Sequence, residues 1–530
     1  MNKKLTNINN LFLIFIIIFS FYINYYYANI GVFPIDTFAF FDTGYNILLD
    51  RHPFKDIWVT TGPLVDYLQS IFFKIFGLNW NSYIIHSSIF NSIVSASLFI
   101  VLIKFKLNKY LSLFYSISFS ILCYPISGTP FAYIHSYILS ILSILIFFYS
   151  IKFNSKRLFF LLPVTMFASF ASMQNPSTYI NFILLISILF YVLSFKRFEI
   201  LKFFLSSCVF IFLIFLIFLK INEIPIQNII QQYFLFPLSM AENRISGNEY
   251  APLTFLERFT FRNVIGHFKF INIYIVFFIV FTFVEIKKKK ILKEDLLINL
   301  ILIFLSLSLI FNQLITSNQT YIFSLIPLLG GFFHIYLNKN FFKLKKFKFF
   351  LILLVLFITI KYHQEYNVKR KFMDLQNVNL KNYVEGSFLD DKFKNLKWVS
   401  PHFSENPQVS ENLQEEVALL KDAIKKIKEI KAKKMVMTHY QFFSLVLEEN
   451  LYIPNRWYTH DNNSYPLKNH KYFEFYKEHL EKNLNKNEIK IIITIGDPDF
   501  ENYRIYLENF CFEESKINKI ATAYHLKNCY

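Results

Sequence analysis

The sequence predicts an α-helical polytopic membrane protein with about eleven transmembrane helices and a small C-terminal extracytoplasmic α/β domain. Three observations predict this class: the composition, the length of the apolar runs, and the positions of Lys and Arg between them. Of the 530 residues, 54% are hydrophobic and 20% aromatic, whereas only 17% are charged. This composition excludes an ordinary soluble domain and a disordered chain.

The predicted transmembrane helices are the apolar runs that are long enough to cross a bilayer. A span needs about 20 mostly apolar residues, and flanking aromatic residues can extend a shorter run. The first run follows two Lys residues and lacks a small-residue cleavage site, so we expect it to remain as a signal anchor. The runs are, approximately, 9–27, 82–103, 110–125, 132–151, 158–174, 177–195, 201–219, 268–285, 296–315, 319–337 and 347–362.

The loops between these runs alternate in charge, which predicts their orientation. One set of loops carries Lys and Arg, for example the run 287–290, whereas the opposite short loops at 124–131, 174–177 and 312–319 carry neither. The positive-inside rule places the N-terminus in the cytoplasm and, after eleven crossings, everything beyond residue 362 outside the inner (plasma) membrane. We attribute the net charge of +18 to this topology and expect membrane lipids, but no nucleic acid, as partners.

The chain divides into a transmembrane domain, 1–362, and an outer domain, 363–530. The transmembrane domain carries two long outer loops, 28–81 and 220–267. In the outer domain, apolar periodicity predicts alternating helices and strands, which indicates a small α/β domain. The predicted elements are a helix over 413–427, a strand over 434–440, helices over 441–450 and 471–484, and a buried strand over 489–496.

Four Cys are too few for a disulfide scaffold. Two of them, Cys511 and Cys529, lie in the outer domain. There they form either a disulfide or two separate buried thiols.

The first outer loop gathers five aspartates in an otherwise basic chain: Asp36, Asp42, Asp50, Asp56 and Asp66. The last three read as structural. Asp56 can cap the turn after a proline, and Asp66 is expected on the solvated side of its helix.

The end of this loop predicts a helix in the membrane interface. One helical face carries Leu64, Leu68, Ile71, Phe72 and Ile75. Such a segment lies in the interface or enters the bilayer obliquely. The aromatic residues expected at headgroup level are Trp58, Tyr67 and Trp80.

The order of motifs in this loop resembles the GT-C superfamily of integral membrane glycosyltransferases, in particular the aminoarabinose transferases and protein O-mannosyltransferases. Members have an acidic motif after the first span, then a "P-Y-x-D" pattern, then a "GPL-x-x-Y-L" helix ending in "F-G". Here these are Asp36, "RHPFKDIW" and "GPLVDYLQSIFFKIFG". Many relatives have Asp-Glu where this chain has Asp36-Thr37, so Asp42 remains a rival for the main role.

The resemblance implies transfer of a sugar, hexosyl or pentosyl, from a polyprenyl-phosphate donor to an acceptor glycan, lipid or protein on the outer face. An acceptor hydroxyl is a weak nucleophile until a nearby carboxylate takes its proton. Asp36 is our first candidate for this general base, and Asp42 is the second.

The leaving lipid phosphate accumulates negative charge, which Arg binds well. The second outer loop offers Arg244, Arg258 and Arg262, with His267 at the start of the next span. On a helix Arg258 and Arg262 share one face, because they are four residues apart. The alternative is that they are interfacial residues with snorkelling side chains.

Five further residues are candidates to line the site: Asp56, His86, His135, Gln174 and Asn175. The alternatives are packing for the two histidines and a helix cap before a proline for the two amides. No metal-ligand spacing is present and no cofactor is expected, although a divalent metal stays open. No Gly-rich phosphate loop is present, which disfavours a nucleotide-sugar donor.

Two other classes of function remain open. One is a transporter or flippase for lipid-linked glycans, which should depend on charges that line a membrane cavity. The other is a polysaccharide polymerase or ligase, which would use polyprenyl-diphosphate oligosaccharides.

Overall fold

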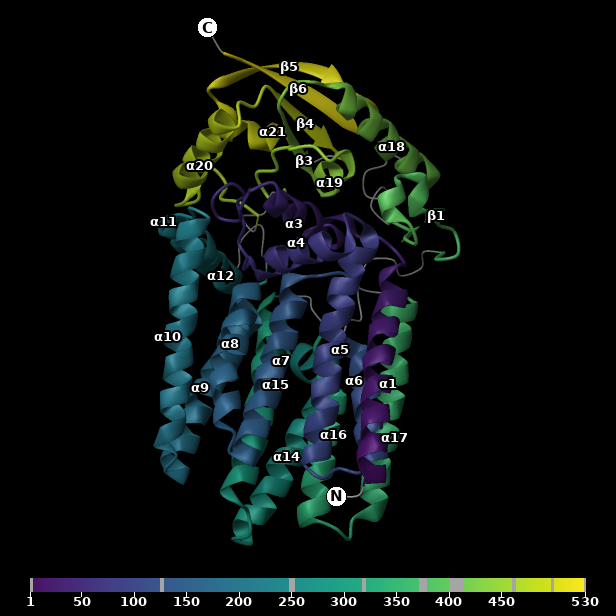
Figure 1. The fold of residues 1–530 in the computed structure, drawn as a ribbon, viewed down its shortest axis with the longest axis vertical. Helices are drawn as coiled ribbons and strands as arrows, with labels where there is room; N and C mark the ends of the chain where they lie inside the picture. Colours follow the sequence, from purple (N-terminus) through teal and green to yellow (C-terminus); the bar gives the residue numbers. More distant parts are fainter. Residues whose placement is uncertain are drawn as a thin grey trace.

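The computed structural model describes residues 3–123, 128–246, 253–316, 321–370, 379–400, 413–459, 464–496 and 500–528. Long helices stand side by side in an upright bundle, and the C-terminal region covers one end of it (Figure 1). The N-terminus lies at the opposite end of the bundle. The first outer loop and the C-terminal region therefore share one end of the molecule, which we call the outer end.

Helices occupy all eleven predicted spans. Within the described residues, nine spans are long and apolar enough to cross a membrane, one of which is α16 together with the 3-10 turn η3 (Tyr321–Ser324) before it; α6 and α8, of 15 and 17 residues, are shorter. The number of crossings and the cytoplasmic location of the N-terminus stay predictions. The helices are α1 (Lys3–Ala28), α5 (Trp80–Lys104), α6 (Lys109–Cys123), α7 (Ala132–Phe153), α8 (Lys156–Ser172), α9 (Gln174–Phe195), α10 (Phe198–Ile221), α14 (Lys269–Lys287), α15 (Lys293–Thr316), α16 (Leu325–Asn340) and α17 (Lys345–Tyr362).

The first outer loop folds into three helices, α2 (Pro34–Thr37), α3 (Phe41–Leu48) and α4 (Leu64–Phe76). On α4 the polar residues Asp66, Gln69 and Ser70 are buried, whereas Ile71 and Ile75 are exposed. Polar residues inside and apolar residues outside are the reverse of the pattern on a water-exposed helix. This distribution fits a helix whose outer side contacts lipid, as predicted for the interface helix.

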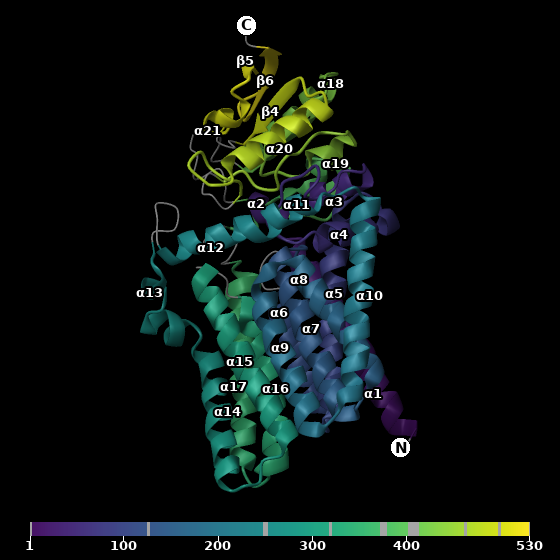
Figure 2. The ribbon, with the colours of Figure 1, turned by 90° about the vertical axis from the view of Figure 1, so that its left-hand side faces the viewer.

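The second outer loop crosses the outer end of the bundle beneath the C-terminal region (Figure 2). Its first part contains α11, the π-helix η1 and α12, and its second part contains α13 and the π-helix η2. Their bounds are α11 (Ile226–Ile229), η1 (Ile230–Leu235), α12 (Phe236–Ser246), α13 (Phe255–Arg258) and η2 (Arg262–His267).

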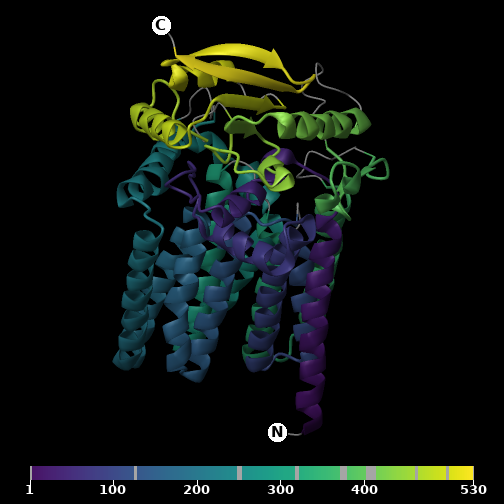
Figure 3. The same cartoon turned by 45° about the horizontal axis from the view of Figure 1, so that its top comes forward.

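The C-terminal region is a small α/β unit, and every predicted element is present. Its sheet has the order β3-β4-β6-β5, in which β3 and β4 are parallel and the other pairs antiparallel. The sheet lies at the end of the molecule farthest from the bundle (Figure 3). The elements are η4 (His363–Val368), β1 (Val384–Glu385), β2 (Lys397–Trp398), α18 (Leu413–Glu429), β3 (Lys434–Thr438), α19 (Phe443–Leu447), α20 (Phe473–Lys486), β4 (Ile491–Ile495), α21 (Phe500–Tyr503), β5 (Phe510–Lys516) and β6 (Ala521–Asn528).

The cysteines of the described residues fall into two groups. Cys511 is disulfide-bonded, whereas Cys123 and Cys208 are free thiols. The predicted partner of Cys511, Cys529, lies outside the described residues.

The two faces of this sheet pack against different parts of the first outer loop. Alternate residues of β3 face opposite sides, so that Val436 joins α18 and Phe38 in one core, whereas Met435 joins α20 and Trp58 in another. The expectation that Trp58 and Trp80 anchor the chain at headgroup level is wrong, because both are buried in these cores. The first outer loop is thus shared between the bundle and the C-terminal region.

Candidate active site

The buried aspartates of the first outer loop bind the C-terminal region. The carboxylate of Asp42 is fully buried and accepts hydrogen bonds from the backbone N–H groups of Ser444, at 3.0 Å, and Leu445, at 2.9 Å. These donors are among the first N–H groups of α19, which have no partner within their own helix. Burial raises the pKa of Asp42 to about 7, against the two hydrogen bonds that lower it. Asp42 therefore caps a helix of the other region.

Asp66 makes the second contact. Its Oδ2 accepts from Nη2 of Arg456 at 2.6 Å, and neither side chain is more than 1% exposed. Thr43 and Thr61 hydrogen-bond to the two members of this pair, and the guanidinium lies over the ring of Phe40 at 4.2 Å. The expectation that Asp66 faces solvent is wrong, because its partner is a buried cation from the C-terminal region.

The other two structural acids lie near one another in sequence but differ in burial. Asp56 is buried, accepts from the backbone N–H of His52 at 2.9 Å, as expected for a turn cap, and pairs with Lys486 of α20 at 2.9 Å. The side chain of Asp50 is 93% exposed and contacts only the ring of His52, at 3.0 Å, among the described residues. Asp56 is engaged by its partners and Asp50 is exposed to solvent, so neither is a buried carboxylate available to take a proton.

Asp36 differs from the other four aspartates. It lies on α2, whose backbone is fixed from two sides: the indole Nε1 of Trp457 donates to the carbonyl oxygen of Ile35 at 2.9 Å, and the Phe33 N–H donates to Thr37 Oγ1 at 3.0 Å. Within the described part of the chain, its carboxyl group is partly buried and makes no hydrogen bond or ion pair. Burial alone raises its pKa to about 7. This is a held carboxyl group with a pKa suited to proton transfer at neutral pH.

The arginines of the second outer loop do not share one helical face. α13 ends at Arg258 and a separate π-helix begins at Arg262, so Arg258 is 4% exposed whereas Arg262 is exposed. Nε of Arg258 donates to the carbonyl oxygen of Leu253 at 3.1 Å, and its Nη1 is buried without a partner among the described residues. The expectation of a two-arginine face is wrong, and of these two residues Arg258 is the one with a buried donor that has no partner among the described residues.

Two other predicted residues of this loop lie elsewhere. His267 is exposed, and its ring contacts Phe268 and Phe323 at centroid distances of 4.7 and 6.0 Å. Arg244 is part of α12, but its side chain lies outside the described residues.

Gln174 joins the two outer loops. Its Nε2 donates to the carbonyl oxygens of Thr60, at 2.9 Å, and Tyr233, at 2.7 Å. Asn175 follows with an extended backbone, φ −114° and ψ 134°, before Pro176. The amide of Gln174 is thus used to hold the loops, although the sequence placed it among the candidates for the substrate.

The histidines His86 and His135 form one buried chain with Gln69. His86 Nδ1 lies 3.0 Å from the Gln69 amide, the two Nε2 atoms are 3.1 Å apart, and His135 Nδ1 lies 3.0 Å from the carbonyl oxygen of Phe131. Because that oxygen only accepts, His135 Nδ1 donates to it. The two rings and Oε1 of Gln69 thus form one buried polar chain that links α4, α5 and α7, which fits the packing alternative.

The sequence did not identify the partners from the C-terminal region. Arg456 and Trp457 occur together in "PNRWY", where an Arg and a Trp interrupt a domain that is rich in Lys and Tyr. This unusual composition was the available signal that the two residues are functional. No helical or strand periodicity in the segment indicates that they contact the first outer loop. His460 and Asp461, which follow them and were too sparse for a metal site, lie outside the described residues.

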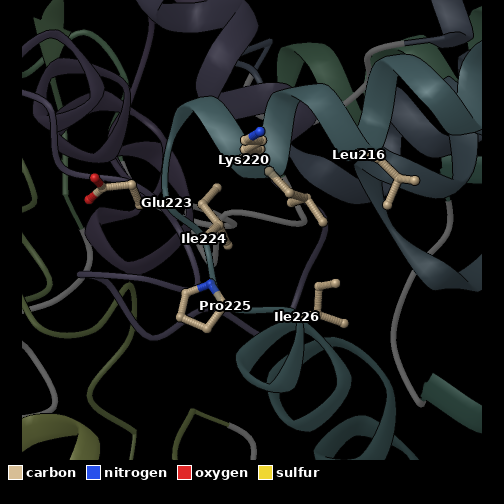
Figure 4. Close-up of a pocket in the computed structure, with 7 residues that line it drawn as sticks. Leu216, Lys220, Glu223, Ile224, Pro225 and Ile226 are labelled. Atoms are coloured by element: carbon tan, nitrogen blue, oxygen red, sulfur yellow. The ribbon is translucent and has the colours of Figure 1, made fainter.

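No cluster of three or more metal-binding side chains occurs within the described residues. A pocket of about 280 Å³ lies in the elbow between α10 and α11, and Figure 4 shows it. It contains none of the predicted site residues. Its lining is Leu216, Leu219, Lys220, Glu223, Ile224, Pro225 and Ile226.

No protein-family model matches the chain, and no curated protein matches it. Among solved structures, the archaeal oligosaccharyltransferase AglB from Archaeoglobus fulgidus, in complex with an inhibitory peptide and a dolichol-phosphate, is similar over 100% of this chain and 75% of that one. The TM-score is 0.44 and the sequence identity is 11%. A similarity at this level carries no argument about function, so function is inferred from the residues of this chain.

Proposed function

We propose that the protein is a membrane glycosyltransferase that moves a sugar from a polyprenyl-phosphate donor to an acceptor on the outer face, with Asp36 as general base. One observation carries the proposal. Of the five aspartates gathered in the first outer loop, three are engaged by the C-terminal region and one is exposed, which leaves Asp36 as the partly buried carboxyl group without a partner among the described residues. The resemblance to the GT-C motif order also favours an acid at this position, although many relatives have Asp-Glu where this chain has Asp36-Thr37.

The reaction requires one proton transfer and one displacement. The Asp36 carboxylate takes the proton of an acceptor hydroxyl or amine, and the acceptor atom forms a bond to the anomeric carbon of the sugar. The bond from that carbon to the phosphate oxygen breaks, and the lipid phosphate leaves with its electrons. A base whose pKa lies near the working pH is well suited to this step. Arg258 is the described cation that we assign to the leaving phosphate.

This function sets the roles of the two domains. The transmembrane domain, 1–362, would bind the lipid donor, and the outer domain, 363–530, would hold the loop that carries Asp36. We propose a location in the inner (plasma) membrane with the outer domain on the extracytoplasmic side. The acceptor would be a glycan, a lipid or a protein, and the sugar a hexose or a pentose.

The test is Asp36→Asn in the purified full chain, supplied with a polyprenyl-phosphate sugar. We expect turnover to be lost while donor binding remains. Because burial raises the pKa of Asp36 from 3.8 to about 7, the charged carboxylate destabilises the folded protein above neutral pH by at most about 4 kcal/mol, and by less because the group is partly exposed. Asp36→Asn should therefore be at least as stable as the wild type at pH 8, whereas loss of a structural residue would lower stability.

Two matched variants accompany it. Asp50→Asn removes an exposed aspartate of the same loop and should leave turnover unchanged. Asp42→Asn weakens the cap of α19 and should cost about 1 kcal/mol of stability while turnover remains. Full turnover by Asp36→Asn would overturn the proposal, and so would loss of turnover only in Asp42→Asn. A flippase would still move lipid in Asp36→Asn, and a polymerase or ligase would require a diphosphate-linked donor.

A further inference from the structure

The segment 253–267, which comprises α13 and η2, lies at the side of the bundle. It leaves the line of α12 and stands beside the outer part of α15, away from α1 (Figure 2). The next residue but one, Lys269, begins α14. The segment therefore continues the outer surface of the membrane bundle.

Aromatic contacts fix how deep the segment lies. The rings of Phe255 and Phe259 contact Phe311 of α15 at centroid distances of 6.4 and 5.7 Å, and Phe311 also contacts Tyr179 of α9 at 5.7 Å. Phe311 precedes Thr316, the last residue of α15, by five positions. At 1.5 Å per residue this distance is roughly 7 Å along the helix axis. α13 thus lies below the outer end of the span to which it is bound.

The other side of the segment is apolar and uncovered. Leu256 and Phe261 are each 80% exposed. Exposure of one such side chain to water costs about 1.5–3 kcal/mol relative to an apolar environment. The adjoining helix α14 also exposes Val276, Ile279, Val280 and Phe283 on its surface. An apolar surface at this depth, continuous with that of a membrane helix, is expected to contact acyl chains.

Arg258 adds a charge at the same depth. Its side chain is 4% exposed, and Nη1 has no partner among the described residues. A guanidinium group at the edge of a bilayer is stable when an anion satisfies it, and the phosphates of the outer leaflet lie just above this level. The capping box formed by Thr254 and Glu257 closes α13 on the other side, so that Glu257 is engaged with Thr254.

We propose that segment 253–267 inserts into the outer leaflet, with Leu256 and Phe261 among the acyl chains and Arg258 bound to the phosphate of a membrane lipid. Insertion goes beyond the proposed enzymatic function and does not depend on it. Only one consequence rests on that function: the same contact would receive the phosphate of the lipid-linked donor.

The insertion is tested with tryptophan variants of the full chain in phosphatidylcholine vesicles whose acyl chains carry bromine, a quencher of indole fluorescence. Leu256→Trp and Phe261→Trp are compared with Glu514→Trp on β5, an exposed position at the far end of the C-terminal region. We expect bromine to quench the fluorescence added by the first two substitutions and to leave that added by the third unchanged. Equal fluorescence with and without bromine at all three positions would overturn the insertion.

The phosphate contact is tested by the amount of lipid phosphate that the purified full chain retains in detergent. Arg258→Gln should retain less than the wild type, Arg258→Lys an intermediate amount, and Arg262→Gln, which removes an exposed arginine nearby, as much as the wild type. Unchanged retention in Arg258→Gln would overturn the contact. Both experiments are repeated in the Asp36→Asn background, with and without polyprenyl phosphate, so that their outcome is independent of turnover.

Discussion

Removal of Arg456 should weaken the attachment of the C-terminal region to the first outer loop. In Arg456→Met the carboxylate of Asp66 stays fully buried but loses the cation that lies 2.6 Å away. Loss of one partner of a buried ion pair costs about 3–5 kcal/mol, because the remaining charge is uncompensated. Loss of the contact between the guanidinium and the ring of Phe40 adds about 1 kcal/mol. At about 1.4 kcal/mol for each factor of ten, the docked state is weakened by at least a hundredfold.

The assay is thermal unfolding of the full chain in lipid nanodiscs, with limited proteolysis of the C-terminal region as a second readout. Lys519→Met is the matched control, because it breaks an ion pair with Glu415 in which both side chains are nearly half exposed, and such a pair contributes less than about 1 kcal/mol. The double variant Asp66→Leu/Arg456→Met removes both charges and should be more stable than Arg456→Met. If Arg456→Met and Lys519→Met lose the same stability, the buried pair does not hold the two regions together.

Two further predictions concern the ionisation of Asp36 and the close packing at Gly62. The pKa of Asp36 is raised to about 7, and a general base must be ionised, so kcat/KM should rise with pH through about 7 and then level off. Asp42→Asn should keep this pH profile. A flat profile between pH 6 and 8 would exclude Asp36 as the titrating base. A Cβ at Gly62 would lie 1.9 Å from the carbonyl oxygen of Ala171, so Gly62→Ala should lower the stability measured by thermal unfolding by about 1–3 kcal/mol. Gly266→Ala is the control and should cost little, because the nearest contact of its Cβ would be 3.9 Å away. Equal effects would contradict the close approach of the first outer loop to α8.

The bundle helices and the longer helices of the C-terminal region were predictable from the sequence, because each depends on a local property. Apolar runs of sufficient length predicted all eleven bundle helices, and four-three spacing predicted α18. β5 and β6 were not predicted, because β5, "FCFEESK", is largely exposed and charged and has no buried apolar run. Local patterns thus identify elements with an apolar run or a periodic apolar side, but not an exposed, charged edge strand such as β5.

The roles of the aspartates were not predictable, because their partners are distant in sequence. Asp42 is 402 positions from Ser444, Asp66 is 390 from Arg456, and Asp56 is 430 from Lys486. A periodic pattern reports which side of a helix is apolar, and on α4 it correctly separated the two sides. It could not report that the polar side faces a buried arginine in place of water. The motif order singled out Asp36, but only the contacts of the other acids distinguish it from Asp42.

These contacts also explain why the acids are concentrated in the first outer loop. A bilayer does not fix the position of a polar loop above it, so a catalytic group there must be held by other parts of the chain. Asp42 binds the start of α19, and Asp66 binds Arg456 within "PNRWY". The indole of the next residue, Trp457, donates to the carbonyl group of Ile35, which precedes Asp36. Displacement of the C-terminal region would therefore move α2 itself. Asp42 and Asp66 thus help to fix the position of Asp36. On the proposed function, Arg456→Met should therefore lower turnover, although the hydrogen bonds of its guanidinium among the described residues go to Thr61 and Asp66 and not to Asp36.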